Sequence, residues 1–325
     1  MPVTNTKNIA SRLIIKYFVI NALLLIGTSA HAAGTCLSDK SDISEDMSKI
    51  HAKLAIKYSK TVYQNNAERD AVLNPIYDKQ QLKVDRNDPF LKQVNAVGVI
   101  TDAPIGSNKS YATALLISPC HILVNAHAVI EKKARQGNAP VYISLGQSSC
   151  QSSNEFTYQD ISGKVIAIGD NNEDISLIRD SKDYAVIKIQ KISDIQLPIV
   201  SMDFITINNA LVTIGFPYSY TYKQKTSLRY PTANFTRKTA VGIDGTFETA
   251  NQNELHGSSG SGIFVLDVGE HNEPQLILGA IIVGRAEGQT GGVGLQTAAI
   301  IQHLKATNPK VYNEVKTAIQ KNNCD

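Results

Sequence analysis

Short β-prone runs separated by polar turns fill most of the chain from about residue 93 onward, and they constrain the fold more than any other feature. Many short strands at close spacing are typical of antiparallel barrels or sandwiches. The runs are Val97–Thr101, Tyr111–Ser118, His121–Val124, Val141–Leu145, Gly163–Ile168, Tyr184–Ile189, Leu211–Ile214, Gly262–Leu266, Leu276–Ile282 and Gly292–Leu295. Helical patterns return at the end, over Ala298–Ala306 and, after an Asn308-Pro309 start signal, over Lys310–Gln320.

The first 32 residues have the pattern of a secretory signal. Three basic residues precede an apolar run from Tyr17 to Ile26, and a small-residue Ala-x-Ala ending closes the segment at Ala32. The run is shorter than the roughly 20 residues that cross a bilayer, which favours a cleaved signal over a membrane anchor. We therefore expect a secreted or periplasmic protein without a stable membrane anchor after cleavage.

The small positive charge of the chain belongs to this signal. The 325 residues contain 32 Lys and Arg against 29 Asp and Glu, and residues 1–32 hold three of the bases and no acid. The remaining chain is balanced, so its net charge gives no electrostatic footprint for nucleic acid, and no nucleic-acid partner is expected. The oligomeric state is not predicted.

The segment 33–89 is expected to be a helical N-terminal extension or a pro-segment. Residues 41–66 read as an amphipathic helix, because Asp42 and Glu45 fit a capping box and apolar residues recur at helical spacing behind them.

Four cysteines follow the signal: Cys36, Cys120, Cys150 and Cys324. An even number in an oxidising compartment favours two disulfides, with three possible pairings. We prefer Cys120–Cys150, which would brace neighbouring strands, together with Cys36–Cys324, which would tie the ends of the mature chain. No C-x-x-C motif or Cys/His cluster is present, so no metal site is expected; a catalytic thiol is the weaker alternative.

Three segments combine residue types that carry out acyl transfer. The first delivers His127 at the end of an apolar strand, between two alanines, where an imidazole suits proton transfer. His121 is the local competitor, but it abuts the preceding turn. The second places Asp183 immediately before a β-forming run, where a carboxylate could orient a histidine; Asp174 has a similar setting and is the alternative.

The third segment is Gly257-Ser258-Ser259-Gly260-Ser261, directly before an apolar strand. Its small residues allow a tight turn that exposes one hydroxyl and leaves backbone N–H groups for an oxyanion. The run is not a phosphate loop, since no Gly-Lys-Ser/Thr follows, and it does not fit the nucleophile elbow of the α/β-hydrolases.

The chain order His, Asp, Ser, with each residue at a strand boundary, resembles the chymotrypsin-fold (trypsin-like) serine proteases, and most of all the bacterial branch that includes the glutamyl endopeptidases. The resemblance covers about residues 90–307. Further segments match the strand that opens the second barrel and the substrate-binding strand: Val212–Pro217 and Gly279–Gly284. It implies an all-β fold with added helices, made of two antiparallel six-stranded β-barrels. Residues 90–200 would carry His and Asp, and residues 201–325 would carry Ser and the C-terminal helices.

The resemblance implies Ser259 as nucleophile, His127 as general base and then acid, and Asp183 as the residue that orients the imidazole. The N–H groups of Gly257 and Ser259 would form the oxyanion hole, and no metal or organic cofactor is implied. The protein would then be a serine endopeptidase that acts on proteins or peptides through an acyl-enzyme.

Substrate preference is expected from an apolar-walled pocket with a polar floor. The family places Asn253 at the pocket base, although Glu254 is adjacent and a shift of one residue in the alignment would restore an acid. Ile282 stands where the glutamyl branch has a histidine, and Gly284 belongs to the same strand. Ser258 replaces the aspartate of trypsin-type zymogens, so activation through a buried N-terminal ammonium is not expected.

Two alternatives remain open at this point. One is a catalytically inert protein of this fold that binds peptides or proteins. The other is an α/β-hydrolase esterase, which would need His271 or His303 behind Ser259 and disagrees with the β-rich texture.

Overall fold

The computed structural model describes Leu82–Lys83 and residues 95–101, 110–149, 156–172, 174, 178–193, 195–206, 209, 211–216, 232–236, 238–242, 244–249, 259–268, 274–285 and 292–324. The predicted signal of residues 1–32, the predicted helix over residues 41–66, Cys36 and Cys150 lie outside this set. Among the described residues, no helix is both long enough and apolar enough to span a membrane.

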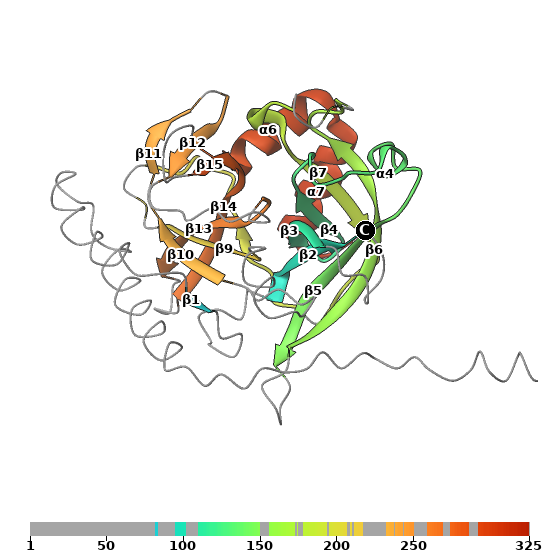
Figure 1. Ribbon diagram of the computed structural model, residues 1–325, viewed down its shortest axis with the longest axis horizontal. Helices are drawn as coiled ribbons and strands as arrows, with labels where there is room; N and C mark the ends of the chain where they lie inside the picture. The colour runs from blue at the N-terminus through green and yellow to red at the C-terminus, as the bar shows by residue number, and fades with distance from the viewer. Residues whose placement is uncertain are drawn as a thin grey trace, which may run out of the picture. The chain divides into compact units, whose positions relative to one another are not determined.

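The first group of strands closes into a barrel with the order β2-β3-β4-β7-β6-β5 (Figure 1). Every pairing within it is antiparallel. The strands are β2 (Val97–Thr101), β3 (Ser110–Ser118), β4 (His121–Val124), β5 (Val141–Ser149), β6 (Phe156–Ile168) and β7 (Ala185–Ile189). The short helix α4 (Lys132–Arg135) and the 3-10 turn η3 (Asp180–Lys182) lie in the connections before β5 and β7.

The second group forms a nine-stranded sheet with the order β1-β10-β9-β13-β14-β15-β12-β11, and β8 pairs with β14 off this path. Only the β8–β14 pairing is parallel among the described strands. The strands are β1 (Leu82–Lys83), β8 (Ile199–Val200), β9 (Leu211–Gly215), β10 (Thr232–Thr236), β11 (Lys238–Val241), β12 (Thr246–Thr249), β13 (Gly262–Val268), β14 (Pro274–Arg285) and β15 (Gly292–Gln296). β1 comes from the segment expected to be helical.

All ten runs predicted as strands are strands, with ends that differ by up to seven residues, and both C-terminal helices are confirmed. The prediction missed β1, β8 and β10–β12. The segments Thr232–Thr236, Lys238–Val241 and Thr246–Thr249 are short and rich in Thr, so their hydrophobic pattern is weak. Pairing with β9 and β15 makes them strands.

Strands whose two faces are both covered account for the strongest sequence signals. β4 is buried along its whole length: Ile122 and Val124 point into the barrel core, and Leu123 points into a second core cluster. That second cluster also contains Val212 and Ile214 of β9, so it joins the barrel to the sheet. Burial on both faces produces a continuous apolar run instead of an alternating one.

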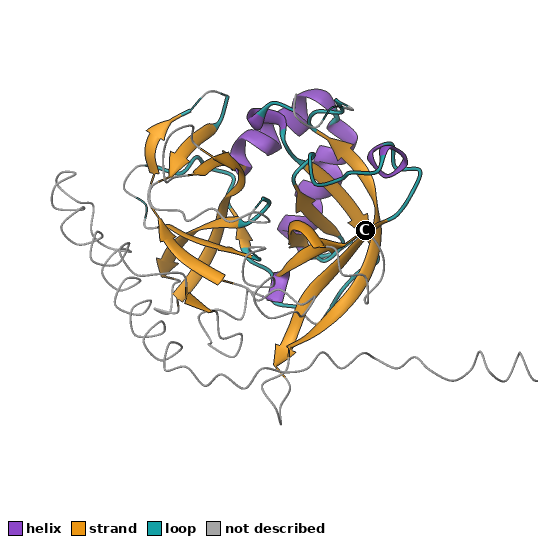
Figure 2. Cartoon of the chain, viewed as in Figure 1, coloured by secondary structure: helices purple, strands orange, loops and turns teal. Residues whose placement is uncertain are grey.

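Two helices complete this shared core (Figure 2). They are α6 (Thr297–Thr307) and α7 (Pro309–Lys321). The Asn308 side chain accepts a hydrogen bond from the Val311 N–H (3.3 Å), and Pro309 occupies the first turn of α7, as the start signal predicted. Leu304 and Val315 are buried against residues of both strand groups.

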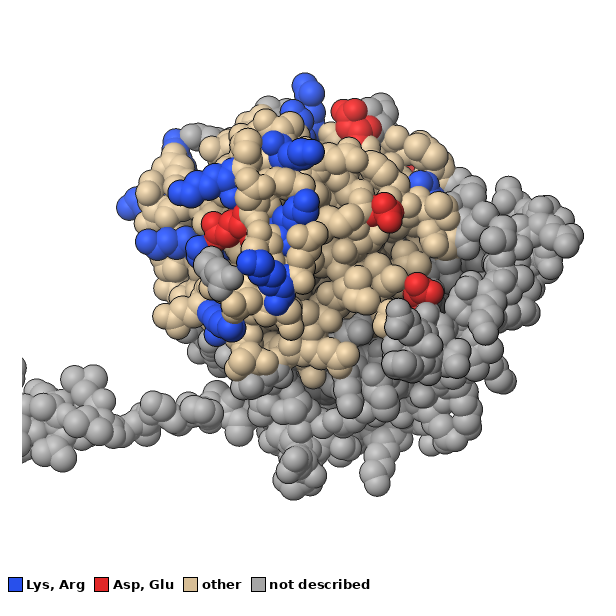
Figure 3. All heavy atoms as spheres, turned by 180° about the vertical axis from the view of Figure 1, so that it is seen from behind, with Lys and Arg blue, Asp and Glu red and all other residues tan. Residues whose placement is uncertain are grey.

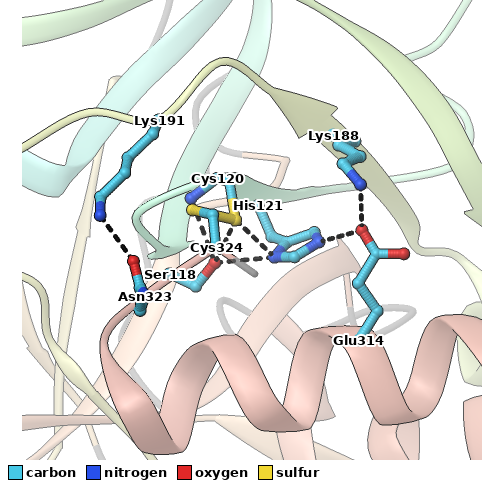
Figure 4. The surroundings of a disulfide bond; sticks show 8 residues. All are labelled: Ser118, Cys120, His121, Lys188, Lys191, Glu314, Asn323 and Cys324. Atoms are coloured by element: carbon cyan, nitrogen blue, oxygen red, sulfur yellow. Dashed lines mark hydrogen bonds and ion pairs between the residues drawn. A yellow bond between two sulfur atoms is a disulfide. The ribbon is translucent and has the colours of Figure 1, made fainter.

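A disulfide between Cys120 and Cys324 ties the end of α7 to the start of β4 (Figure 4). The preferred pairings Cys120–Cys150 and Cys36–Cys324 are therefore wrong. The packing of α7 against the barrel brings the Cα atoms of Cys120 and Cys324 to 6.0 Å, across a sequence separation of 204 residues. Spacing along the chain cannot reveal such a contact.

Three polar contacts flank this disulfide. The ammonium of Lys188 donates to Glu314 (2.6 Å), and that of Lys191 donates to Asn323 (2.6 Å). His121 is 1 % exposed and contacts Glu314 through Nε2 (3.2 Å). Together with the disulfide, these contacts fasten α7 to the barrel.

Candidate active site

β4 ends in a tight turn that carries His127. The N–H of Ala128 donates to the carbonyl of Asn125 (3.3 Å), and that of Val129 donates to the carbonyl of Ala126 (3.2 Å). The two alanines beside His127 are buried, whereas the His127 side chain is 29 % exposed. The turn thus holds the imidazole in place and leaves one of its edges accessible.

The buried guanidinium of Arg135, in α4, braces this turn. Its Nη1 donates to the carbonyls of Ala126 (2.7 Å) and Val129 (3.3 Å), and its Nη2 donates to those of Asp170 and Asn172 (both 2.9 Å). The guanidinium links the His127 turn to the loop after β6. Sequence reasoning missed this residue, because a lone arginine in a polar helix gives no sign that it is buried.

Asp183 lies directly after η3 and is 2 % exposed. Its carboxylate accepts hydrogen bonds from His127 Nδ1 (2.6 Å) and from the His127 backbone N–H (2.9 Å). Asn125 Nδ2 donates to the same carboxylate (3.3 Å) and to the Asp183 carbonyl (3.1 Å). Three donors therefore hold one buried carboxylate against the imidazole.

This geometry assigns the tautomer of His127. An ionised carboxylate only accepts, so Nδ1 carries a proton that points at Asp183, and neutral Nε2 is left as an acceptor. Among the described residues, Nε2 has no hydrogen-bond partner. The imidazole can therefore take a proton at Nε2 while Asp183 stabilises the resulting cation.

Ser259 and Gly260 form the turn that leads into β13, and Ser259 is partly exposed. Gly260 has φ +80°, and a Cβ there would stand 2.1 Å from the Thr113 carbonyl oxygen, so only glycine fits. The Thr113 N–H donates to the Ser259 carbonyl (2.7 Å), and the Gly260 N–H donates to the Ile282 carbonyl (2.9 Å). The turn is thus bonded to β3 of the barrel and to β14 of the sheet.

The serine turn also lies against the histidine turn. The Cβ position of Gly260 is 3.2 Å from Oδ1 of Asn125, two residues before His127. That oxygen is buried and accepts no hydrogen bond from any described residue. Ser259 and His127 are not hydrogen-bonded to each other in the described structure, and catalytic contacts are often longer before substrate binds.

Asn125 is a site residue whose contribution sequence reasoning missed. Its amide contacts the Asp183 carboxylate on one side and faces Gly260 on the other. The signal that could have found it is its position directly after the apolar strand and two residues before the histidine, in the turn that carries His127.

The predicted substrate-binding residues lie in different settings. Ile282 is 2 % exposed and packs in a core cluster with Phe247 and Ile263. Gly284 is half-buried further along β14. Asn253 and Gly257 lie outside the described residues, as do Ser258 and Glu254.

The structure separates the predicted residues from their competitors. Asp183, and not Asp174, bonds to His127. His121 is buried beside Glu314 and is a structural residue. His303, the described histidine that the esterase alternative could use, is hydrogen-bonded to Tyr184.

Tyr184 connects this site to helix α6. Burial raises the pKa of the Tyr184 phenol, and the pKa of His303 is lowered by burial and by the nearby Lys182 charge. A protonated phenol therefore donates to the neutral Nδ1 of His303 over 2.6 Å. This contact anchors the residue that follows Asp183.

Charged side chains of the described residues are unevenly distributed, although residues 33–325 together carry no formal net charge. Lys and Arg gather over one half of the face drawn in Figure 3, with few acids among them. Exposed Lys164 and Lys188 stand opposite each other on β6 and β7, and Lys188 reaches Glu314 of α7. Net charge alone could not predict this grouping.

Comparison with known proteins identifies the fold. No protein-family model and no curated protein matches the sequence. Among solved structures, the chain is similar to a Glu endopeptidase in complex with MPD, at 17 % identity and a TM-score of 0.51, over 72 % of this chain and 99 % of that one. The predicted chymotrypsin-like fold is confirmed, with one closed six-stranded barrel as expected. In place of the predicted second six-stranded barrel, the described residues form a nine-stranded sheet.

Two further similar structures are of the Rv3671c protease. One is an inactive form, at 15 % identity and a TM-score of 0.43, over 69 % of this chain and 94 % of that one. The other is an inactive serine-to-alanine mutant from M. tuberculosis, at 13 % identity and a TM-score of 0.42, over 69 % and 92 %.

Proposed function

We propose that this chain is a serine endopeptidase that hydrolyses peptide bonds in proteins or peptides through Ser259, His127 and Asp183. The observation that supports this most is the His127–Asp183 pair, in which a buried carboxylate accepts from Nδ1 and leaves Nε2 accessible. The hydrogen bonds that join the Ser259 turn to Thr113 of β3 and to Ile282 of β14 add to it, since they hold the serine turn between the barrel and the sheet.

In the first step, His127 Nε2 takes the proton of the Ser259 hydroxyl while Oγ attacks the carbonyl carbon of the substrate. The imidazolium then gives this proton to the nitrogen of the leaving amine as the C–N bond breaks, which leaves an acyl-enzyme ester. Water attacks the ester with the same proton transfers in the same order, so that the acid product leaves and Ser259 regains its proton.

Two parts of the proposal come from the sequence. Backbone N–H groups of Gly257 and Ser259 would stabilise the tetrahedral oxyanion, which is a large contribution in acyl transfer. The signal pattern of residues 1–32 would direct the chain to a secreted or periplasmic location, with which the Cys120–Cys324 disulfide agrees.

The test is active-site labelling with a fluorophosphonate probe. We expect covalent labelling of the mature protein and none of Ser259→Ala. Ser261→Ala is the matched control: its hydroxyl is two residues away, 2 % exposed, and lies 3.3 Å from the Thr113 hydroxyl, so labelling should persist.

Labelling that survives in Ser259→Ala would contradict the nucleophile assignment. A folded protein that neither labels nor cleaves peptides would support the other candidate, an inert protein of this fold that binds peptides. The observation that favours this second candidate is that Ser259 and His127 are not hydrogen-bonded to each other in the described structure.

A further inference from the structure

Within the part of the chain that the structure describes, one edge of β14 next to the serine turn has no strand partner. β13 pairs with β14 as far as Ile281, and the Ser259–Ser261 turn continues through two bonds to Ile282. Beyond that point the described residues pair β14 on the β15 side alone, through Gly284 and Arg285. An open strand edge accepts an extended peptide through backbone hydrogen bonds, so a substrate peptide can lie along this part of β14.

The carboxylate of Asp180 stands over this edge. Its Oδ1 and Oδ2 are 3.5 and 3.8 Å from the point that a Cβ of Gly284 would occupy. Because residue 284 has no side chain, nothing on it separates the carboxylate from the strand. Asp180 is exposed, and it begins η3, three residues before Asp183.

This carboxylate is held in an unfavourable environment. Partial burial raises the pKa of Asp180, the charge of Asp183 raises it further, and only His127 acts in the opposite direction. No described residue forms a hydrogen bond or an ion pair with its side chain. A carboxylate with these neighbours, and without a cationic partner among the described residues, is stabilised when a cation arrives.

We propose that Asp180 selects substrates with a lysine or arginine about two residues from the cleaved bond, on the side bound along β14. Ile282 is hydrogen-bonded to the serine turn, and Gly284 lies two residues further along the strand. A peptide bound along β14 would therefore place a residue about two positions from the cleaved bond beside Asp180. The inference rests on the proposed endopeptidase function. It adds a determinant of specificity separate from the predicted pocket around Asn253.

The test uses internally quenched peptides in which each position near the cleaved bond is varied. For the wild type we expect kcat/KM to be roughly two- to fivefold higher with Lys or Arg than with Leu at one position on the β14 side, as for a partly exposed ion pair. Asp180→Asn should lose this preference, Asp180→Glu should retain most of it, and Asp180→Lys should prefer Asp or Glu there.

Asp203→Asn is the matched control, because it removes the same charge from an exposed position in the connection between β8 and β9 of the sheet. Its preference should equal that of the wild type. An Asp180→Asn protein that is labelled by the fluorophosphonate, cleaves peptides and keeps the basic preference would overturn the inference while the proposed function stands.

A second measurement does not require turnover. Ser259→Ala should bind a Lys-containing peptide more tightly than its Leu counterpart, and Asp180→Asn in the same background should remove the difference. Equal binding of both peptides to Ser259→Ala would overturn the inference even if the chain proves to be an inert binding protein. Absence of labelling alone would count against the proposed function.

Discussion

His121 begins β4 and His127 lies in the turn after this strand; each contacts a carboxylate, yet the two pairs are built in opposite ways. At His127 the carboxylate of Asp183 is 3 % exposed and the imidazole is 29 % exposed. At His121 the imidazole is 1 % exposed and the carboxylate of Glu314 is 25 % exposed. A buried acid with an accessible base suits proton transfer to a substrate, whereas a buried base with an accessible acid serves packing.

The second nitrogen of each ring extends this contrast. In His121, Nδ1 is 2.8 Å from the Ser118 hydroxyl, so both ring nitrogens have partners. In His127, Nε2 has none among the described residues. A histidine beside a carboxylate is therefore not by itself a general base. A general base also needs a ring nitrogen that is accessible and free to accept a proton.

Among the predictions, substitution of His127 should have the largest effect on activity, and substitution of His121 should have little. His127→Ala should lower kcat/KM by about 10⁵- to 10⁶-fold, because no described residue can replace its Nε2. His121→Asn should leave turnover within a fewfold of wild type and lower the melting temperature instead. Peptidase assays and thermal unfolding of both variants check this, and comparable activity losses would break the contrast.

The acids should differ almost as much. Asp183→Asn should reduce kcat by about 10⁴-fold, because an amide no longer holds the His127 tautomer. Asp174→Asn, the matched change at the competing acid, should leave kcat unchanged. Steady-state kinetics of the two purified variants decide the matter, and the reverse result would transfer the role to Asp174.

Loss of the Asn125 amide should have an intermediate effect. Asn125→Ala removes two hydrogen bonds to Asp183, and we expect kcat to fall about 10- to 100-fold as the carboxylate loses its orientation. The control is Asn138→Ala at an exposed turn. If Asn125→Ala lowers the melting temperature but not kcat, the amide serves the fold alone.

The Cys120–Cys324 disulfide lies next to His121, and its loss should lower the stability of the protein more than its catalytic rate. Cys324→Ser should lower the free energy of unfolding by about 2–4 kcal/mol, since it frees the end of α7. Kinetics at a temperature where the variant stays folded should remain near wild type. Mass mapping without reductant should find the Cys120 and Cys324 peptides joined; a Cys120–Cys150 peptide would contradict the structure.

The smallest effect concerns pH. Burial lowers the pKa of His121, and the contact with Glu314 only partly compensates. A lowered pKa in the folded state gives stability that is present above the usual histidine pKa of about 6.5 and is lost as pH falls through the folded value. Thermal unfolding between pH 7 and 5 should therefore show a decline that is shallower in His121→Asn; an equal decline would remove this role.

Sequence patterns predicted most of the fold because its core strands are apolar on both faces. Runs such as Leu211–Ile214 are β-forming whatever they pack against, and all ten were confirmed. The missed strands β10–β12 are polar and short, and they become strands through pairing with β9 and β15. The proposed triad could likewise be nominated from residue types at strand boundaries and from family resemblance.

By itself, the sequence determined the local conformations and the candidate chemical groups, since β-propensity, helix capping and glycine turns act within a few residues. Only the tertiary structure decided which groups meet. It paired Cys120 with Cys324, chose Asp183 over Asp174 for His127, brought the Asn125 amide to that carboxylate, and set Asp180 over Gly284. These contacts join distant segments, and they depend on how barrel, sheet and helices pack, which no local pattern encodes.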